Sequence, residues 1–319
     1  MLKFLRISIG AMLLLGCMAT AWAQQNAKIP KIGYLGVTSA SPNNMRMLRQ
    51  GFQELGYIEG KNIALEFRWG ENRNERLPEL AADLVRQKVD VIVTSGGPAT
   101  RAAMQVTSSV PIVMALDTDP VGNGFVASLA QPGGNVTGNS SMHHELIGKQ
   151  MELLKILLPR MSRVAVLGNF GNLQALKEAE AASRILGLHT LPLDVREARD
   201  IEPAMDAAAR AKADAILVLP IALNLTRLSE LAVERRLPVW YSSTIHVDAG
   251  GLAAYSTRYD DLYRRAAIYV DKILKGRKPA DLPVEQPTRF ELVLNMKTAK
   301  AMGLTVPQSF LLRVDRMIE

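Results

Sequence analysis

Residues 89–100 read VDVIVTSGGPAT, and this stretch decides the class of fold. Val89–Thr94 is a short apolar run rich in valine and isoleucine, which predicts a buried strand. Two glycines end the run, and Pro98 suits the first turn of a helix that we expect to extend to about Ser108. A strand that passes through a glycine turn into a helix is the building unit of parallel α/β folds.

The same unit recurs on both sides of this stretch, where short apolar runs alternate with amphipathic segments of helical period. The other predicted strands are Lys31–Val37, Asn62–Trp69, Pro111–Leu116, Val136–Ser141, Arg163–Gly168, His189–Val195, Ala215–Leu219, Pro238–Ser242 and Leu252–Ser256. This alternation predicts an α/β fold of two doubly wound lobes, each a parallel sheet covered by helices on both faces.

Glycine-rich breaks near residues 134, 250 and 280 indicate that the chain crosses between the lobes about three times. We expect residues 30–134 plus about 252–277 to form lobe 1, and residues 135–250 plus about 280–319 to form lobe 2. The final stretch after Phe290 predicts a strand, a helix and a tail. Ligands of open α/β sheets bind beyond the carboxyl ends of the strands, so two facing sheets would enclose a ligand cleft.

Residues 1–23 have the layout of a secretory signal peptide. A basic start precedes an apolar stretch that is too short for a membrane span of roughly 20 residues. The small residues of Ala21-Trp22-Ala23 fit a signal-peptidase site, so we expect a soluble periplasmic protein that begins near Gln24. Leu14-Leu15-Gly16-Cys17 resembles a lipoprotein box, which makes lipid anchoring through Cys17 the alternative.

Composition narrows the function further. Cleavage after Ala23 removes the only cysteine, which excludes disulfides and cysteine-ligated metals, and lowers the formal charge from +7 to +5. We interpret this mild excess of charge as a solvated surface. No basic cluster carries interleaved aromatic residues, so we expect no nucleic-acid partner. With 48% hydrophobic residues the chain can build its core without disulfides, and we expect a monomer.

The first candidate site is the loop Ser95-Gly96-Gly97 with Thr100 in the following turn. Glycines let the backbone approach a ligand, and the start of the helix offers free N–H groups, which suits a carboxylate or a phosphate. The loop is not a Walker loop, because no Gly-Lys-Ser/Thr follows. An ordinary tight turn is the alternative. Leu35 and Gly36, at the end of the first strand, belong to the same expected edge.

A second candidate is Asp117-Thr118-Asp119-Pro120-Val121, which follows a buried strand. It superficially matches the nucleophile loop of aspartate phosphatases. That loop normally follows the first strand, and such enzymes need Mg²⁺ and further carboxylates. We therefore expect one aspartate to cap the next turn while the hydroxyl of Thr118 faces the cleft.

Small, polar and aromatic residues also end the strands of the second half. In a two-lobed cleft they would line the opposite wall, where aromatic faces could stack on a flat ligand. Each of them could equally be a simple turn residue. The candidates are Gly168, Asn169, Pro220, Tyr241, Ser242 and Tyr255.

The spacing of the histidines does not predict a catalytic or metal site. Adjacent helical residues such as His143 and His144 point about 100° apart and cannot easily share one ion, so we interpret the histidines as surface or capping residues. A Gly-x-Ser-x-Gly elbow is absent. A hydrolase of sugars or phosphates on an α/β scaffold stays a remote alternative, since no complete catalytic set is present. We predict no metal, no cofactor and no enzyme activity.

Longer stretches of the chain resemble one known family: Arg49–Gly60 (RQGFQELGYIEG), Asp119–Gly138 (DPVGNGFVASLAQPGGNVTG) and Pro283–Gly303 (PVEQPTRFELVLNMKTAKAMG). They resemble the ABC-transporter substrate-binding proteins of the tryptophan/tyrosine type, which have the type I periplasmic binding fold. The resemblance covers essentially residues 31–318.

This resemblance implies a two-lobe clamp that closes on a small solute and delivers it to a membrane permease. It implies that the loop Ser95–Gly97 binds a ligand carboxylate, with Thr118 nearby. A periplasmic ligand sensor of the same fold, which would present its closed form to a membrane receptor, is the alternative.

The chain departs from the family pattern at one place. After Leu217-Val218-Leu219-Pro220, related proteins often have an Asp or Asn that can hold a ligand ammonium, whereas this chain has Ile221-Ala222-Leu223. An unpaired buried ammonium is costly. We therefore expect the ligand to be an aromatic or other carboxylate without an α-amine.

Overall fold

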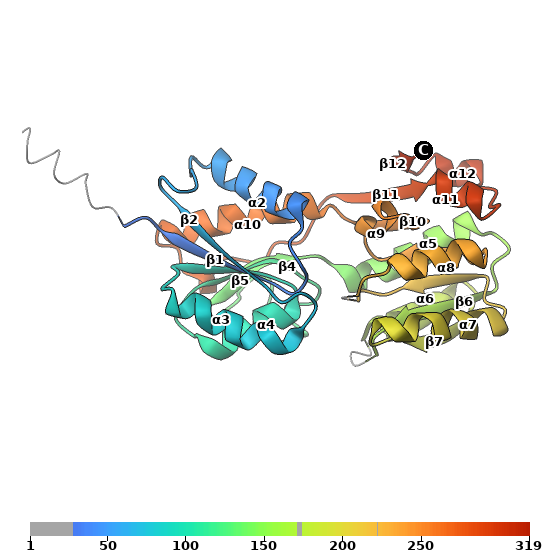
Figure 1. Ribbon diagram of the computed structural model, residues 1–319, viewed down its shortest axis with the longest axis horizontal. Helices are drawn as coiled ribbons and strands as arrows, with labels where there is room; N and C mark the ends of the chain where they lie inside the picture. The colour runs from blue at the N-terminus through green and yellow to red at the C-terminus, as the bar shows by residue number, and fades with distance from the viewer. Residues whose placement is uncertain (1–27, 171–173, 222) are drawn as a thin grey trace, which may run out of the picture.

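The chain forms two α/β lobes that lie side by side (Figure 1). This computed structural model describes residues 28–170, 174–221 and 223–319. The predicted signal peptide, with Cys17, lies outside the described residues. In the described ranges no helix is both long enough and apolar enough to cross a membrane.

The N-terminal lobe is built on a five-stranded sheet, counted over the described residues, in which all strands run parallel in the order β2-β1-β3-β4-β5. Its strands are β1 (Lys31–Gly36), β2 (Ala64–Trp69), β3 (Val91–Ser95), β4 (Ile112–Asp117) and β5 (Val136–Ser140). Its helices are α2 (Pro42–Glu54), η1 (Asn74–Arg76), α3 (Leu77–Arg86), α4 (Gly97–Val106), α10 (Tyr259–Leu274) and η3 (Pro279–Asp281). Helices α2 and α10 cover one face of the sheet, and α3 and α4 cover the other (Figure 1).

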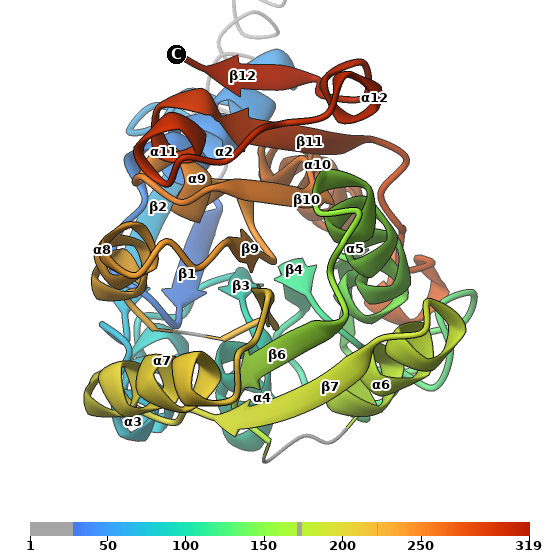
Figure 2. The same ribbon diagram turned by 90° about the vertical axis from the view of Figure 1, so that its right-hand side faces the viewer.

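The C-terminal lobe has a seven-stranded sheet within the described ranges, in the order β12-β11-β10-β9-β8-β6-β7. Its strands are β6 (Arg163–Gly168), β7 (His189–Asp194), β8 (Ala215–Val218), β9 (Val239–Tyr241), β10 (Ala253–Thr257), β11 (Phe290–Asn295) and β12 (Arg316–Ile318). Its helices are α5 (His143–Leu157), α6 (Gln174–Ile185), η2 (Ala198–Asp200), α7 (Ile201–Arg210), α8 (Thr226–Glu234), α9 (Thr244–Asp248), α11 (Met296–Ala301) and α12 (Gln308–Leu311). Strands β10 and β11 pair antiparallel, and the other pairs are parallel. Helices α5 and α6 flank one face, and α7 and α8 the other (Figure 2).

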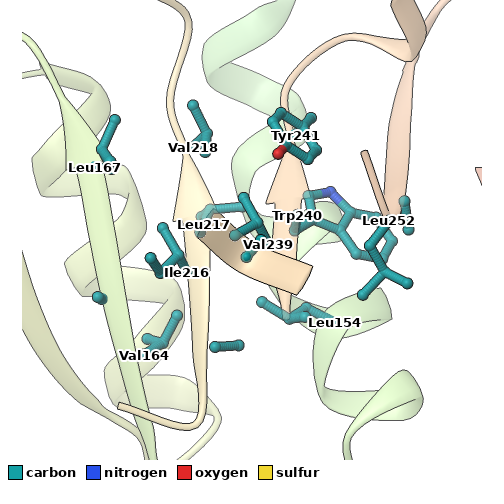
Figure 3. Packing of buried hydrophobic residues seen from close by; sticks show 14 of the residues in the cluster. Leu154, Val164, Leu167, Ile216, Leu217, Val218, Val239, Trp240, Tyr241 and Leu252 are labelled. Atoms are coloured by element: carbon teal, nitrogen blue, oxygen red, sulfur yellow. The ribbon is translucent and has the colours of Figure 1, made fainter. Parts of the chain in front are cut away.

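Apolar side chains fill the core of the C-terminal lobe. The strands β8 and β9 are buried along their whole length, and β6 is buried beyond Arg163, as expected for parallel strands covered on both faces. Trp240 and Tyr241 on β9 are fully buried between the sheet and its helices (Figure 3). The hydroxyl of Tyr241 shares a 2.7 Å hydrogen bond with Ser229 Oγ, which gives its polar end a partner inside the core.

The chain passes between the lobes at three neighbouring places in the described part: after β5, after β10 and before β11. Thr257 Oγ1 donates to the carbonyl of Ser141 at 2.8 Å, and Arg258 N–H donates to the carbonyl of Arg289. These bonds tie the three crossings to one another. Met142, at the first crossing, has a left-handed backbone with φ of 53°. The crossings therefore form one narrow connection between two separately packed cores.

All three crossings lie later in the chain than the sequence predicts. The third follows Val284 and not residue 280, since Leu282 and Val284 pack in the core of the N-terminal lobe. Strand β5 pairs with β4, so the N-terminal sheet extends to Ser140 and not only to residue 134. Strand β10 pairs with β9, so residues 253–257 belong to the C-terminal sheet, and only α10 returns to the N-terminal lobe. The glycine breaks mark turns within a lobe, because a turn residue reports a reversal of the chain and not a change of sheet.

Two further elements differ from the sequence prediction. The expected C-terminal tail contains α12 and the edge strand β12. Strand β12 pairs with β11, and Arg316 forms ion pairs with Asp248 and Glu291. The strand is only three residues long, so its local pattern is too short to predict it.

Candidate functional site

A cavity of about 680 Å³ lies between the two lobes, at the carboxyl ends of the parallel strands. Its volume is within the range of roughly 300–1,000 Å³ that is usual for small-molecule sites. Segments that follow β1, β3 and β4 form one wall, and segments that follow β6, β8 and β9 form the other. The fold therefore brings the two sets of strand ends together at one cleft, as the sequence predicts.

The loop Ser95-Gly96-Gly97 lies on the N-terminal wall, between β3 and α4. Gly96 has a φ of +94°, a conformation that favours glycine, and it caps α4 without a side-chain hydrogen bond. A Cβ on Gly97 would lie 3.1 Å from Asp117 Oδ2, so this position also has little room for a side chain. Pro98 has no N–H, and the N–H groups of Gly96, Ala99 and Thr100 donate to carbonyls of the lobe. The start of α4 thus presents the N–H of Gly97 and the positive end of its dipole to the cleft.

Asp117 supports this loop from behind. Its side chain is fully buried, and its Oδ1 accepts hydrogen bonds from Asp119 N–H at 2.9 Å and from Asn123 Nδ2 at 3.0 Å. Asp119 Oδ1 accepts from Gly122 N–H at 2.8 Å. Burial raises the pKa of Asp117. Both aspartates therefore hold the turn after β4, while Thr118 lines the cavity.

Helix α10 contributes Tyr259 and Tyr263 to the cleft, and the sequence prediction misses both. Tyr263 OH shares a 2.6 Å hydrogen bond with Ser95 Oγ, and Tyr259 OH shares one of the same length with His143 Nε2. Burial raises the pKa of both phenols, which keeps them neutral. The interpretation of His143 as a surface or capping residue is wrong, because its side chain is buried and lines the cavity.

The C-terminal wall is mostly uncharged. The predicted residues Asn169, Pro220 and Ser242 lie on it. Ile221, next to Pro220 at the end of the predicted strand, lies there too. The residues that the prediction misses there include Ala175, Leu219, Ser243, Ile245 and His246. Burial lowers the pKa of His246, so this ring is neutral near pH 7. The short helix α9, which carries Ile245 and His246, gives no clear helical period from which to predict it.

Arg101 is the only lysine or arginine among the described residues that line the cavity, and no aspartate or glutamate lines it. It lies on α4, one turn beyond the loop. Its guanidinium lies 5.0 Å from the ring centre of Phe125 and donates to the carbonyl of Asn123 at 3.4 Å. The described residues hold no carboxylate in a salt bridge with it. The cleft therefore carries a fixed positive charge beside a helix N-terminus.

Seven of the fourteen sequence candidates line the cavity, and seven lie behind its walls. Those on the lining are Ser95, Gly96, Gly97, Thr118, Asn169, Pro220 and Ser242. Those behind are Leu35, Gly36, Thr100, Asp117, Gly168, Tyr241 and Tyr255.

Packing explains why the seven residues behind the walls do not line the cavity. Leu35 belongs to the core under α3 and α4, and Gly36 packs under the ring of Trp69. Thr100 Oγ1 shares a 2.8 Å hydrogen bond with Thr94 inside the lobe. Tyr255 stacks on Phe290 of the neighbouring strand.

Of the remaining three, Asp117 holds the turn after β4, and the other two have equally local partners. Gly168 packs against Leu219, and Tyr241 lies in the core (Figure 3). The described residues contain no group of three or more histidine, cysteine, aspartate or glutamate side chains that could hold a metal ion.

Two largely parallel sheets whose strand ends face one cleft, joined by adjacent crossings, define a two-lobed binding protein of the type I periplasmic binding fold. The family model of ABC transporter substrate binding proteins matches residues 40–318. The chain therefore belongs to the ABC transporter substrate-binding protein family, which confirms the resemblance found in the sequence.

Individual relatives agree with this assignment. A tyrosine-binding protein of Clostridioides difficile (strain R20291) is 27% identical over 262 residues, which cover 80% of this chain and 75% of that protein. The structure of an ABC domain from Streptococcus pneumoniae in complex with L-Trp matches with a TM-score of 0.83 at 28% identity, over 91% of this chain and 99% of that one. A conserved domain protein from Vibrio cholerae gives a TM-score of 0.83 at 27% identity and covers 91% and 100%. The predicted fold class is confirmed.

Proposed function

We propose that this protein is the periplasmic binding component of an ABC importer and that it captures a small carboxylate in the cleft between its lobes. The observation that carries the proposal is the placement of Arg101 and the start of α4 on one wall of that cleft, with no acidic side chain among the described lining residues. A helix N-terminus and a guanidinium both bind carboxylates.

Capture would occur by closure of the lobes. Each lobe has its own core, and the three adjacent crossings are the natural place for a rigid-body rotation. A ligand that touches both walls interacts better with the closed state than with the open one, and this difference in affinity shifts the equilibrium toward closure. The closed form would then be the one delivered to the permease.

The named relatives support a small ligand that carries a carboxylate. One is called a tyrosine-binding protein, and another was solved with L-Trp. Both molecules carry a carboxylate and an aromatic body. A binding role also fits the chemistry of the loop, because Ser95 Oγ shares its hydrogen bond with a phenol and not with a histidine that could act as a base. We infer binding without turnover.

Replacing Arg101 with Gln tests the site. We expect carboxylate affinity to fall roughly 10- to 100-fold, because a charge-assisted hydrogen bond is lost. The measurement is a thermal-shift screen against a panel of carboxylates, followed by calorimetry of the hits. A ligand at about 100 times its dissociation constant stabilises the native state by roughly 2.7 kcal/mol.

The matched control is Arg160→Gln, since Arg160 is an exposed arginine of the C-terminal lobe that does not line the cleft. It should leave affinity unchanged. Equal affinities of wild type and Arg101→Gln for every hit would remove Arg101 from the site.

A further inference from the structure

We infer that the ligand is an amine-free carboxylate with an apolar body, because no carboxylate among the described lining residues can pair with an α-ammonium group. This inference rests on the proposed function and specifies its ligand. It starts from the charges of the cleft. Among the described residues that line the cleft, Arg101 is the only one with a permanent charge, and this charge is positive. A ligand ammonium would therefore enter the cleft beside a cation with no carboxylate to pair with it.

The nearest carboxylates do not supply that partner. Asp117 is fully buried behind Gly97, and its Oδ1 accepts from Asp119 N–H and Asn123 Nδ2. Its Oδ2 has no hydrogen-bond partner among the described residues but is itself buried. Asp117 therefore lies outside the cavity lining, although it is close in space. Asp119 is engaged with Gly122 N–H in the same turn and does not line the cavity either. Removing an ammonium from water without a charged partner costs several kcal/mol.

The opposite wall is built for an apolar group. Leu219, Pro220 and Ile221 follow β8 and line the cavity directly opposite the lobe that carries Arg101. Ile221 packs against the core of its lobe while remaining partly open to the cleft. Ile245 from α9 joins them with 51% of its surface exposed. An exposed large aliphatic side chain at a cavity is a ready contact for an apolar ligand.

The two walls together give the ligand an orientation. Its carboxylate would lie at the start of α4 and near Arg101, and its apolar body would extend toward Ile221 and Ile245. The neutral polar groups between them, among them Ser242 and His246, can donate or accept hydrogen bonds but carry no negative charge at neutral pH. The class that fits is an aromatic or branched aliphatic monocarboxylate.

The test is calorimetry of the full-length secreted protein with matched pairs that differ only in the amine: tryptophan and indole-3-propionate, tyrosine and 3-(4-hydroxyphenyl)propionate, leucine and 4-methylpentanoate. We expect the amine-free member of at least one pair to bind roughly 10-fold tighter or more than its amino acid, the factor that an unpaired charge would impose. Equal or tighter binding of the amino acid in the best-bound pair overturns the inference.

The variant Ile221→Asp provides the gain of function. It places a carboxylate on the apolar wall, so we expect the preference to move toward the amino acid by roughly 10-fold. Ile221→Asn is the matched control, because it has nearly the same shape without the charge and should weaken the amine-free ligand without improving the amino acid. Circular dichroism confirms that each variant is folded. If Ile221→Asp is folded and the preference stays unchanged, the lack of a carboxylate in the cleft does not set the preference, and the inference is overturned.

A second pair of variants keeps the question open to test if Ile221→Asp does not fold. Ile245→Ser should weaken the amine-free ligand, whereas Ile185→Ser, at an isoleucine that is 84% exposed on α6 and away from the cleft, should not. Equal affinities of the Ile245→Ser variant and wild type would place the apolar body of the ligand elsewhere.

If no member of any pair binds but a sugar or polyol closes the lobes, the ligand class is wrong and the binding function stands. If no solute closes the lobes, the proposed function itself fails.

Discussion

The histidine at position 246 shows how one residue can couple the cleft to pH. Burial lowers the pKa of this ring below its ordinary value of 6.5. The folded protein therefore holds fewer protons than the unfolded chain as the pH falls. His246 contributes stability that is fully present above pH 6.5 and is lost as the pH falls through its lowered pKa.

We predict that His246→Gln reduces this loss of stability at acid pH. Urea unfolding of wild type and variant at a series of pH values above and below 6.5 measures it. His189→Gln, at an exposed histidine of β7, is the control and should follow the wild-type curve. If His246→Gln loses as much stability at acid pH as the wild type, other groups cause the loss.

At the scale of elements, the packing of α10 on α2 determines how firmly the returning helix is held in the N-terminal lobe. Gly51 lies in the middle of α2, and a Cβ there would lie 2.5 Å from the carbonyl of Arg264 and 2.9 Å from Ala267 Cβ. No flexible side chain can move aside from such a contact. We expect Gly51→Ala to cost roughly 1–3 kcal/mol in the free energy of unfolding.

The helical control is Gly148→Ala in α5, where a Cβ would meet nothing within 4 Å. Because alanine is the better helix former, this change should stabilise the protein by up to about 1 kcal/mol. Chemical denaturation of both variants gives the comparison. If Gly51→Ala leaves the free energy of unfolding unchanged, helices α2 and α10 can move apart without loss of stability.

The elements also show how far sequence reasoning reaches. The loop Ser95–Gly97 could be predicted, because a strand, a glycine turn and a helix start are all local features. Thr100 was expected at the cleft but faces Thr94, since its place on the first turn of α4 directs the hydroxyl into the lobe. Tyr259 and His143 could not be predicted, because they meet only when two crossings far apart in sequence lie side by side.

At the scale of the whole molecule, the account depends on two cores joined by one narrow connection. The alternation of strands and helices was enough to predict the two lobes. The crossings were placed too early, because glycine turns report local reversals and the pairing of β5 and β10 is a tertiary property. The cleft follows from the facing strand ends, and its charge follows from the one arginine that α4 presents there.

The most direct test of the central claim is small-angle X-ray scattering of the wild-type protein with and without a saturating mixture of indole-3-propionate, 3-(4-hydroxyphenyl)propionate and 4-methylpentanoate. If these carboxylates bridge the two walls, the radius of gyration should fall on their addition as the lobes close. In Arg101→Gln the same fall should need roughly 10- to 100-fold more carboxylate. An unchanged radius of gyration in wild type, at concentrations where native mass spectrometry shows the carboxylate bound, would contradict capture by closure.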